Sequence, residues 1–184
     1  ELAGRYPVIN GEPTVAYLWA RTAREKVTMG TIPLLKTFWV CKKKGKRVAL
    51  LPVPKADKSG VDFRLLGEME IGNPEKVLKD HPFLKKWEIE KGNFGDFLKN
   101  GTMNRAGVWS PCSGRPGLIA LTMEDLRTQG QRKMLGTQMT AVVVEAVSGD
   151  GRKTYKKYRL PVEEEVKAAE VEIEELEEAF RDVP

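Results

Sequence analysis

The stretch Ile32–Pro54, IPLLKTFWVCKKKGKRVALLPVP, predicts a β-hairpin. Two apolar runs, Ile32–Lys43 and Val48–Pro54, flank a short basic turn that contains a glycine. This pattern is typical of two antiparallel strands joined by a tight connection. The hairpin would carry Lys44 and Lys46 at its tip.

A second hairpin is predicted further along the chain. The runs Thr140–Val147 and Lys153–Pro161 are joined by SGDGR, whose Asp-Gly pair supplies the positive φ that such turns need. Three further strands are expected, because these stretches are rich in β-branched and aromatic residues: Thr14–Thr22, Val61–Ile71 and Gly107–Cys112.

Capping residues indicate two helices. Asn73 precedes a helix that begins with Pro74 at its first position, and Pro82 stops or kinks that helix. Thr122 is an N-cap for the helix Met123–Leu135, which carries acidic residues in its first turn and is followed by a glycine.

The segment after Pro161 predicts a third helix, Val162–Phe180, whose apolar residues recur at helical spacing. The stretch Glu88–Asn100 is expected to be irregular, with a short helical turn at Gly95–Asn100. The resulting fold class is α+β, with antiparallel β-hairpins forming a mixed sheet and about three helices. We expect residues 1–160 to form a basic α+β domain and residues 161–184 an acidic amphipathic helix.

Charge is distributed unevenly along the 184 residues, whose net charge is +5. From Pro161 onward ten acidic residues face two basic ones, a net of −8, so the first 160 residues carry +13. A body this basic favours a polyanionic partner, and the acidic end of the chain could shield it.

The apolar content of the sequence is typical of a globular protein. At 41% hydrophobic residues, the chain can bury a core. No apolar run is long enough to cross a membrane, so we expect a soluble protein with no membrane partner. Two unpatterned cysteines favour a reducing compartment, and we expect a cytoplasmic location. The chain begins with Glu1 rather than Met, and we expect it to be a piece of a longer protein.

Motifs of enzymes are mostly absent from the sequence. It contains no G-x-G-x-x-G after a strand, no P-loop and no G-x-S-x-G elbow. Cys41, Cys112 and His81 have no zinc-knuckle spacing, and we expect no bound metal. Cys41 is expected to be buried in a strand, and His81 to face solvent.

Both hairpins combine basic residues with aromatics, a pattern that favours nucleic-acid binding. The alternative remains open that these basic residues only form solvated faces or protect strand edges from aggregation. Trp39 and Trp109 are expected to be core residues rather than base-stacking platforms. The candidate nucleic-acid-binding residues are Lys42, Lys43, Lys44, Lys46, Arg47, Arg115, Arg152, Lys153, Lys156, Lys157 and Arg159.

Four blocks together carry a resemblance to a known family: Tyr6–Ala23, Ile32–Val53, Asn100–Gly117 and Met139–Pro161. Their order and spacing resemble the adenine-specific DNA methylases described as containing a Zn-ribbon, bacterial and archaeal proteins often encoded near phage-defence genes. The blocks cover well over half of the chain. The stretch YLWART followed by the PLLKTFW hairpin is the most specific part of the resemblance.

The resemblance implies that this chain is a non-catalytic insert of a larger methylase. The parent would use S-adenosylmethionine to methylate adenine N6, but neither the glycine-containing cofactor loop nor the Asp/Asn-Pro-Pro-aromatic motif of such enzymes occurs in this chain. We therefore expect no cofactor here, with S-adenosylmethionine bound by the parent. The insert would bind double-stranded DNA or help recognise the target. Alternatively, its acidic helix would dock a protein partner in phage defence, and a stand-alone enzyme is disfavoured by the poverty of titratable clusters.

The sequence departs from the family at its metal-binding turns. Family members often show a Cys-Pro-x-x-Cys-type knuckle where this chain has Ala23–Gly30, AREKVTMG, and in the second knuckle only Cys112 remains. We expect a degenerate zinc-ribbon-like turn that Pro111, Gly114 and Pro116 hold without an ion.

Overall fold

The computed structural model describes residues 7–149 and 152–169. By their internal contacts, the described residues divide into two compact units. The larger unit is Trp19–Thr140, and the smaller one combines the described residues before Trp19 with those after Thr140. The long strands β1 (Thr14–Arg24) and β6 (Gly136–Val147) each contribute residues to both units.

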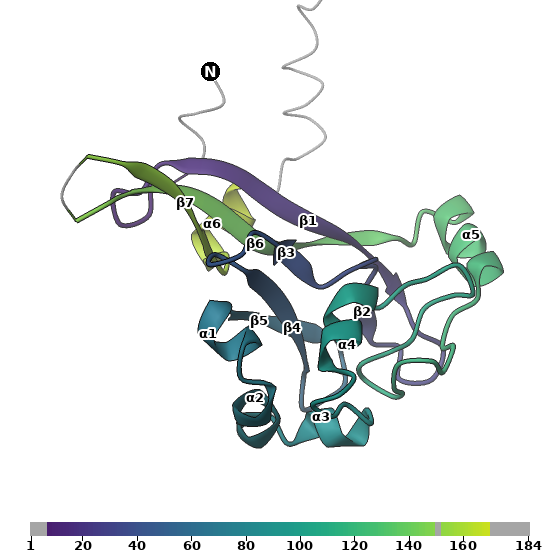
Figure 1. Cartoon of the computed structure of the whole chain (residues 1–184). Coiled ribbons are helices and arrows are strands. Elements are labelled where there is room, and N and C mark those ends of the chain that lie inside the picture. Colours follow the sequence, from purple (N-terminus) through teal and green to yellow (C-terminus); the bar gives the residue numbers. More distant parts are fainter. Residues whose placement is uncertain (1–6, 150–151, 170–184) are drawn as a thin grey trace, which may run out of the picture. The chain divides into compact units, whose positions relative to one another are not determined.

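The predicted α+β class is confirmed, and the strands form two sheets (Figure 1). One sheet has the order β2-β1-β6-β7 and the other the order β3-β4-β5. The remaining strands are β2 (Thr31–Pro33), β3 (Trp39–Cys41), β4 (Val48–Pro54), β5 (Val61–Leu66) and β7 (Thr154–Arg159).

The first predicted hairpin is confirmed as β3 and β4, which pair antiparallel. Its first apolar run is split, however. Residues 31–33 form β2, which pairs with β1 so that Thr22 lies opposite Pro33. Strand β4 also pairs antiparallel with β5, from Ala49 opposite Leu66 to Pro54 opposite Val61. The second hairpin is confirmed as β6 and β7, while the Asp-Gly pair of its turn lies outside the described residues.

Six helices occur among the described residues, where about three were expected. The predicted caps of two are confirmed: Asn73 accepts a hydrogen bond from the backbone of Lys76, and Thr122 accepts one from Asp125. The start of the predicted acidic helix is α6, and its residues from 170 onward lie outside the described part. The helices are α1 (Glu68–Ile71), α2 (Pro74–Asp80), α3 (Phe83–Lys86), α4 (Phe94–Asn100), α5 (Met123–Gln131) and α6 (Glu163–Ala168).

Two predicted strands differ from the structure. The expected strand Val61–Ile71 ends at Leu66, because Gly67 is the N-cap of α1 and donates its backbone N–H to the side chain of Glu70. The stretch Gly107–Cys112 is not a strand: Val108 makes only isolated bridges. Beyond it the chain turns back on itself.

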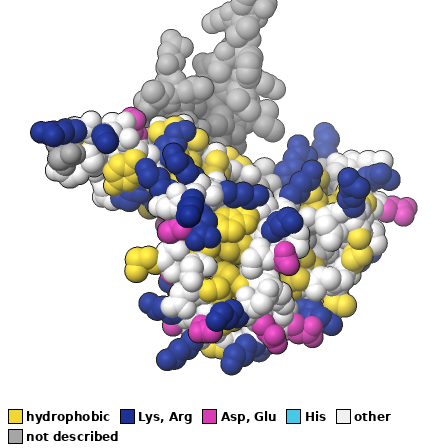
Figure 2. Space-filling view, in the orientation of Figure 1, with side chains coloured by type: hydrophobic (Ala, Val, Ile, Leu, Met, Phe, Trp, Pro, Cys, Tyr) yellow, Lys and Arg dark blue, Asp and Glu magenta, His cyan; other side chains and the backbone are white. Residues whose placement is uncertain are grey.

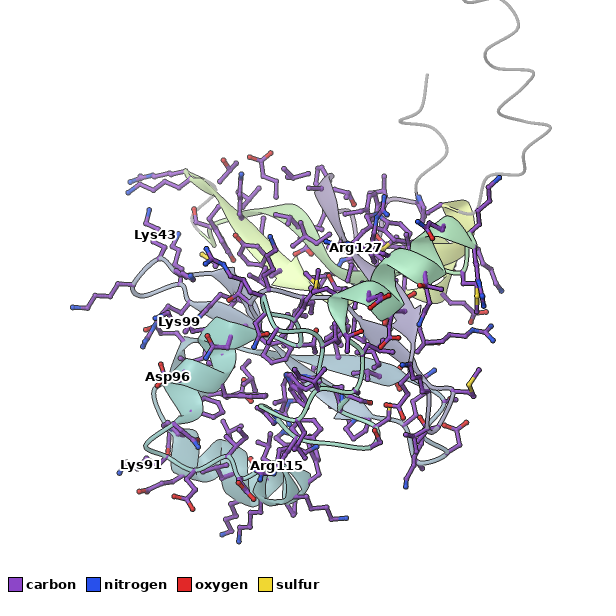
Figure 3. All side chains as sticks on the ribbon, turned by 90° about the vertical axis from the view of Figure 1, so that its right-hand side faces the viewer. Lys43, Lys91, Asp96, Lys99, Arg115 and Arg127 are labelled. Atoms are coloured by element: carbon purple, nitrogen blue, oxygen red, sulfur yellow. The ribbon has the colours of Figure 1, made fainter. Side chains whose placement is uncertain are left out.

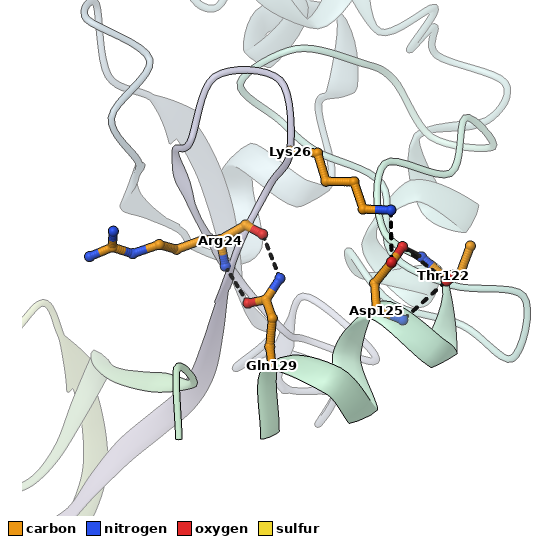
Figure 4. A network of polar contacts seen from close by, with 5 residues as sticks. All are labelled: Arg24, Lys26, Thr122, Asp125 and Gln129. Atoms are coloured by element: carbon orange, nitrogen blue, oxygen red, sulfur yellow. Dashed lines mark hydrogen bonds and ion pairs between the residues drawn. The ribbon is translucent and has the colours of Figure 1, made fainter. Parts of the chain in front are cut away.

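Helix α5 is fastened to the end of β1 by polar contacts (Figure 4). The side-chain amide of Gln129 accepts from the backbone N–H of Arg24 at 2.9 Å and donates to its carbonyl at 2.7 Å. Lys26 pairs with Asp125 at 2.7 Å and, with the Thr122 hydrogen bonds, holds the pKa of Asp125 at about 2. The helix ends at Gln131 rather than at the predicted Leu135.

The core of the larger unit is aromatic and aliphatic. Phe38 and Leu51 are fully buried, and burying such a side chain stabilises the fold by about 1.5–3 kcal/mol. Trp87 contacts Trp109 edge-to-face at 5.2 Å, and both are buried. The Trp109 indole donates a 2.8 Å hydrogen bond to the carbonyl of Gly101. Trp109 is therefore a core residue, as predicted.

The smaller unit is organised around a buried ion pair. Arg159 at the end of β7 donates two hydrogen bonds of 2.6 Å to the carboxylate of Glu165, whose side chain is fully buried. Burial raises the pKa of Glu165, but hydrogen bonds from Arg159 and Val162 lower it below its usual value. Among the described residues, no helix has the length and apolar character of a membrane span.

Candidate nucleic-acid interface

The tip of the β3–β4 hairpin carries three consecutive exposed lysines, Lys42 to Lys44. A tight turn fixes their backbone, because Lys46 donates its N–H to the carbonyl of Lys43 at 2.9 Å and Gly45 adopts a φ of +79°. A left-handed φ of this kind is open to glycine at little cost. The side chains of Lys42 to Lys44 therefore stand on a defined ribbon.

Arg47, just past the lysines at the tip, forms an ion pair within the larger unit. Its guanidinium pairs with Glu68 of α1 at 2.7 Å, and its backbone N–H donates to the same carboxylate. The hydrogen bond from Arg47 lowers the pKa of Glu68. This pair fastens the base of the hairpin to α1, so the charge of Arg47 is already matched by a carboxylate.

More lysines line the side of the larger unit that holds the hairpin tip. In Figure 3 the side chains of Lys43, Lys99 and Lys91 extend along one edge of the view, with Asp96 among them. Lys91 is paired with Glu75 at 2.8 Å. The edge is thus basic but interrupted by carboxylates.

Strand β7 and the part of β6 with which it pairs, Val142–Val147, belong to the smaller unit. Lys and Arg side chains gather near the end of this hairpin (Figure 2), and Arg152, Lys153 and Lys156 are exposed. The other two predicted residues are engaged within the unit: Lys157 pairs with Glu12 at 2.8 Å, and Arg159 forms the buried pair with Glu165. The exposed positive charge of this hairpin therefore lies toward its turn.

Arg115 lies on neither hairpin. It is half-buried in the loop that follows the Gly107–Cys112 stretch, and its guanidinium pairs with Glu88. Sequence reasoning missed the residues around it. Lys55, Lys58 and Lys86 line the same cavity as Arg115, although the chain separates them widely. No local pattern links these positions, so only the fold reveals the cluster.

The turn that follows Ser110 is joined to a second turn by a buried carboxylate. Glu25 is 1% exposed and accepts from the backbone N–H of Thr28 at 2.9 Å and from its hydroxyl at 2.7 Å. From the other turn, Ser113 donates to Glu25 at 2.9 Å, and the side chain of Ser110 also hydrogen-bonds it. Glu25 and Thr28 lie in one turn and Ser110 and Ser113 in the other, and in each turn two residues stand between them.

Hydrogen bonds keep this carboxylate ionised. Burial raises the pKa of Glu25, but the hydrogen bonds from Ser110, Thr28 and Ser113 outweigh it and lower the pKa below its usual range. Buried charges are stable only when they are paired or well hydrogen-bonded. The two turns therefore satisfy Glu25 between them.

These residues do not fit the zinc that the resemblance implies. Structural zinc takes thiolate and imidazole ligands, whereas the groups that meet here are one carboxylate and three hydroxyls that each hydrogen-bond to it. Cys112 directs its thiol to the carbonyl of Gly60 at 3.3 Å instead, and burial raises its pKa. Within the described residues, no group of three or more His, Cys, Asp and Glu could hold a metal ion.

Cys41, His81 and Trp39 are all half-buried. Cys41 is half-buried in β3, so it is less buried than expected. His81 is also half-buried rather than fully exposed, and its ring lies 2.8 Å from the guanidinium of Arg64. Burial, and then the charge of Arg64, lower its pKa.

Comparisons with protein-family models, with curated proteins and with solved structures found no match to this chain.

Proposed function

We propose that this chain is a DNA-binding or target-recognition insert of an S-adenosylmethionine-dependent adenine-specific DNA methyltransferase and carries none of its catalytic groups. The observation that carries the DNA-binding part is the row of exposed lysines, Lys42 to Lys44, on the rigid tip of a β-hairpin. A two-stranded ribbon fits the major groove, and lysines neutralise phosphates.

The anchoring of this hairpin supports the proposal. The Arg47–Glu68 pair holds its base to α1, and the backbone N–H of Leu50 in β4 donates to the carbonyl of Phe38, which is fully buried. A rigid ribbon loses little conformational entropy when it binds. The methylase assignment itself is supported by the resemblance of the sequence blocks, and an enzyme that extrudes its target base gains from a module that grips the flanking duplex.

The testing experiment measures binding of the whole chain to a labelled random-sequence duplex by fluorescence anisotropy. We expect a Kd between about 1 and 100 μM that weakens as salt rises. The triple charge reversal Lys42→Glu, Lys43→Glu and Lys44→Glu should weaken binding by on the order of tenfold or more.

A matched control distinguishes DNA binding by the hairpin lysines from a general effect of net charge. Lys76, Lys79 and Lys85 are exposed on α2 and α3, and their triple reversal to Glu changes the net charge equally. The proposal expects a smaller effect from this control than from the hairpin variant. Equal effects, or no binding by the wild-type chain at low salt, would count against a DNA-binding hairpin.

A second candidate function is docking of a protein partner through the acidic end of the chain. It is favoured by Glu163 and Glu164, two exposed carboxylates in the first turn of α6. Glu165, by contrast, is buried in an ion pair with Arg159 and does not face solvent. The double variant Glu163→Gln with Glu164→Gln should weaken capture of such a partner and leave DNA binding intact, whereas loss of DNA binding would contradict this division of roles.

A further inference from the structure

A cavity of about 530 Å³ lies on the larger unit, between three separate segments of chain. Its walls come from the turn that follows β4, from α3 with the residue after it, and from the loop that begins at Pro111. Cavities of about 300–1,000 Å³ suit small organic ligands. The size therefore allows one nucleotide-sized molecule.

The cavity lining is strongly cationic. Lys55, Lys58, Lys86 and Arg115 line it, and no carboxylate does so among the described residues. Two of these cations already have a partner: Arg115 pairs with Glu88, and Lys55 lies 3.7 Å from a carboxylate of β5. Concentrated like charge without matching carboxylates in the lining favours an anionic ligand.

Lys58 and Lys86 are the two lining cations without a carboxylate partner among the described residues. Both are exposed, and they belong to different walls of the cavity. Two ammonium groups on separate walls can share one phosphate, as charge-assisted hydrogen bonds to it are strong.

Aromatic side chains give the cavity an apolar wall beside its lysines. Phe83 is half-buried and meets the buried Trp87 edge-to-face at 5.1 Å, and both line the cavity. Leu118, which is 53% exposed, adds an apolar side. A planar ring can stack on such a surface without sequence-specific hydrogen bonds.

Contacts within the fold hold the walls in place. The turn of Lys58 is closed by a 3.0 Å backbone hydrogen bond to Lys55, and Lys58 itself has a φ of +61°. In the loop that begins at Pro111, the Cys112 thiol donates a hydrogen bond to the carbonyl of Gly60, and the Ser113 hydroxyl donates one to the buried carboxylate of Glu25. The cavity is therefore preformed, which lowers the entropic cost of binding.

We propose that this cavity binds a nucleoside monophosphate group, with the phosphate held by Lys58 and Lys86 and the base against Phe83. The same chemistry is present in a free mononucleotide and in the 5′-phosphorylated end of a nucleic-acid strand. This site does not include the hairpin lysines, so the nucleotide proposal and the proposed duplex binding can each be wrong without the other.

The first test titrates the whole chain with adenosine monophosphate and with inorganic phosphate by calorimetry, with tryptophan fluorescence as a second readout. The nucleotide should bind at least about tenfold more tightly than phosphate, because only the nucleotide contacts the aromatic wall. Equal affinities, or no heat with the nucleotide at millimolar concentration, would overturn the proposal.

Variants assign the contacts. Lys58→Gln with Lys86→Gln should weaken nucleotide binding at least about tenfold. The matched pair Lys76→Gln and Lys79→Gln, exposed on α2, should leave it unchanged. Phe83→Leu should weaken nucleotide binding and spare phosphate binding. Thermal unfolding of each variant checks that it folds, and a folded lysine pair variant with wild-type affinity would refute the assignment.

A third arm distinguishes the two sources of the ligand. A short single-stranded oligonucleotide is compared with and without its 5′-phosphate. Tighter binding of the phosphorylated strand supports recognition of a strand end, and binding of the mononucleotide alone supports a free nucleotide. Unphosphorylated duplex serves as the control for the hairpin: its binding should depend on Lys42 to Lys44 and not on Lys58 or Lys86.

Discussion

The hydroxyl of Ser113 donates a 2.9 Å hydrogen bond to Oε2 of Glu25, which lies 88 residues earlier in the chain. Ser113 is an exposed residue in a turn whose other residues, Pro111 and Cys112, are buried, and Glu25 is 1% exposed. Together with Thr28 and Ser110, these residues form a joint of hydrogen bonds between two turns of the chain.

Replacement of Glu25 by glutamine should destabilise the larger unit. The glutamine amide would present donors where Thr28 and Ser113 also donate, so at least one hydrogen bond to a buried charge is lost. We expect the free energy of unfolding to fall by about 3 kcal/mol, measured by urea titration. Glu90→Gln, at an exposed position, is the control and should change it by less than about 0.5 kcal/mol.

The same carboxylate predicts a dependence of stability on pH. The folded pKa of Glu25 lies below the ordinary value of 4.5, so its contribution is complete above that value and is lost as the pH falls through the folded pKa. The difference in unfolding free energy between wild type and Glu25→Gln should therefore shrink below about pH 4.5. A difference that stays constant down to about pH 3 would mean that folding does not lower the pKa of Glu25.

Breaking the buried ion pair of the smaller unit should cost more than removing an exposed one. Arg159→Met leaves the fully buried Glu165 without its partner, and we expect a loss of about 3–5 kcal/mol in unfolding free energy. The double variant Arg159→Met with Glu165→Leu should recover much of this loss. Lys167→Met removes an exposed pair with Glu163 and should cost less than about 0.5 kcal/mol.

Gly30 should not tolerate a side chain. A Cβ there would lie 2.3 Å from the carbonyl of Lys58, which is backbone and cannot swing aside. We expect Gly30→Ala to lower the free energy of unfolding by about 3 kcal/mol. Gly95 in α4 has no atom within 4 Å of such a Cβ, and Gly95→Ala should be neutral or stabilising by up to about 1 kcal/mol. Thermal unfolding that ranks the two variants the other way would contradict the close packing.

The salt dependence of DNA binding tests the hairpin lysines quantitatively. The slope of log K against log salt changes by about 0.9 for each phosphate contact. If Lys42 to Lys44 each meet a phosphate, their triple change to Gln should lower the magnitude of this slope by about 2.7. An unchanged slope with unchanged affinity would place the contacts elsewhere on the chain.

Local patterns in the sequence predicted the hairpins and the caps well. The apolar runs that flank the β3–β4 turn, and the capping side chains of Asn73 and Thr122, determine structure within a few residues of themselves. Helix α1 was missed because the apolar residues before and after Gly67 read as one strand. The Gly107–Cys112 stretch was misread for a related reason: its buried Val108 and Trp109 pack against the core rather than into a strand ladder.

Contacts between distant segments were beyond the reach of the sequence. Glu25 had no visible role, because its partners Ser110 and Ser113 lie in another turn. Arg115 was proposed for its charge, but the lysines that share its cavity come from the β4–β5 turn and from α3. Arg47 and Arg159 were proposed on the same ground, and the structure shows each matched by a carboxylate.

The joint at Glu25 also bears on how long the folded chain persists. Its two turns are separated by 88 residues, so forming the Ser113 contact early in folding would close a long, entropically costly loop. Such a contact is expected to form after the folding transition state. Its loss should then speed unfolding and leave the refolding rate nearly unchanged. A buried carboxylate with its three hydroxyl partners would thus set the lifetime of the larger unit more than the rate at which it folds.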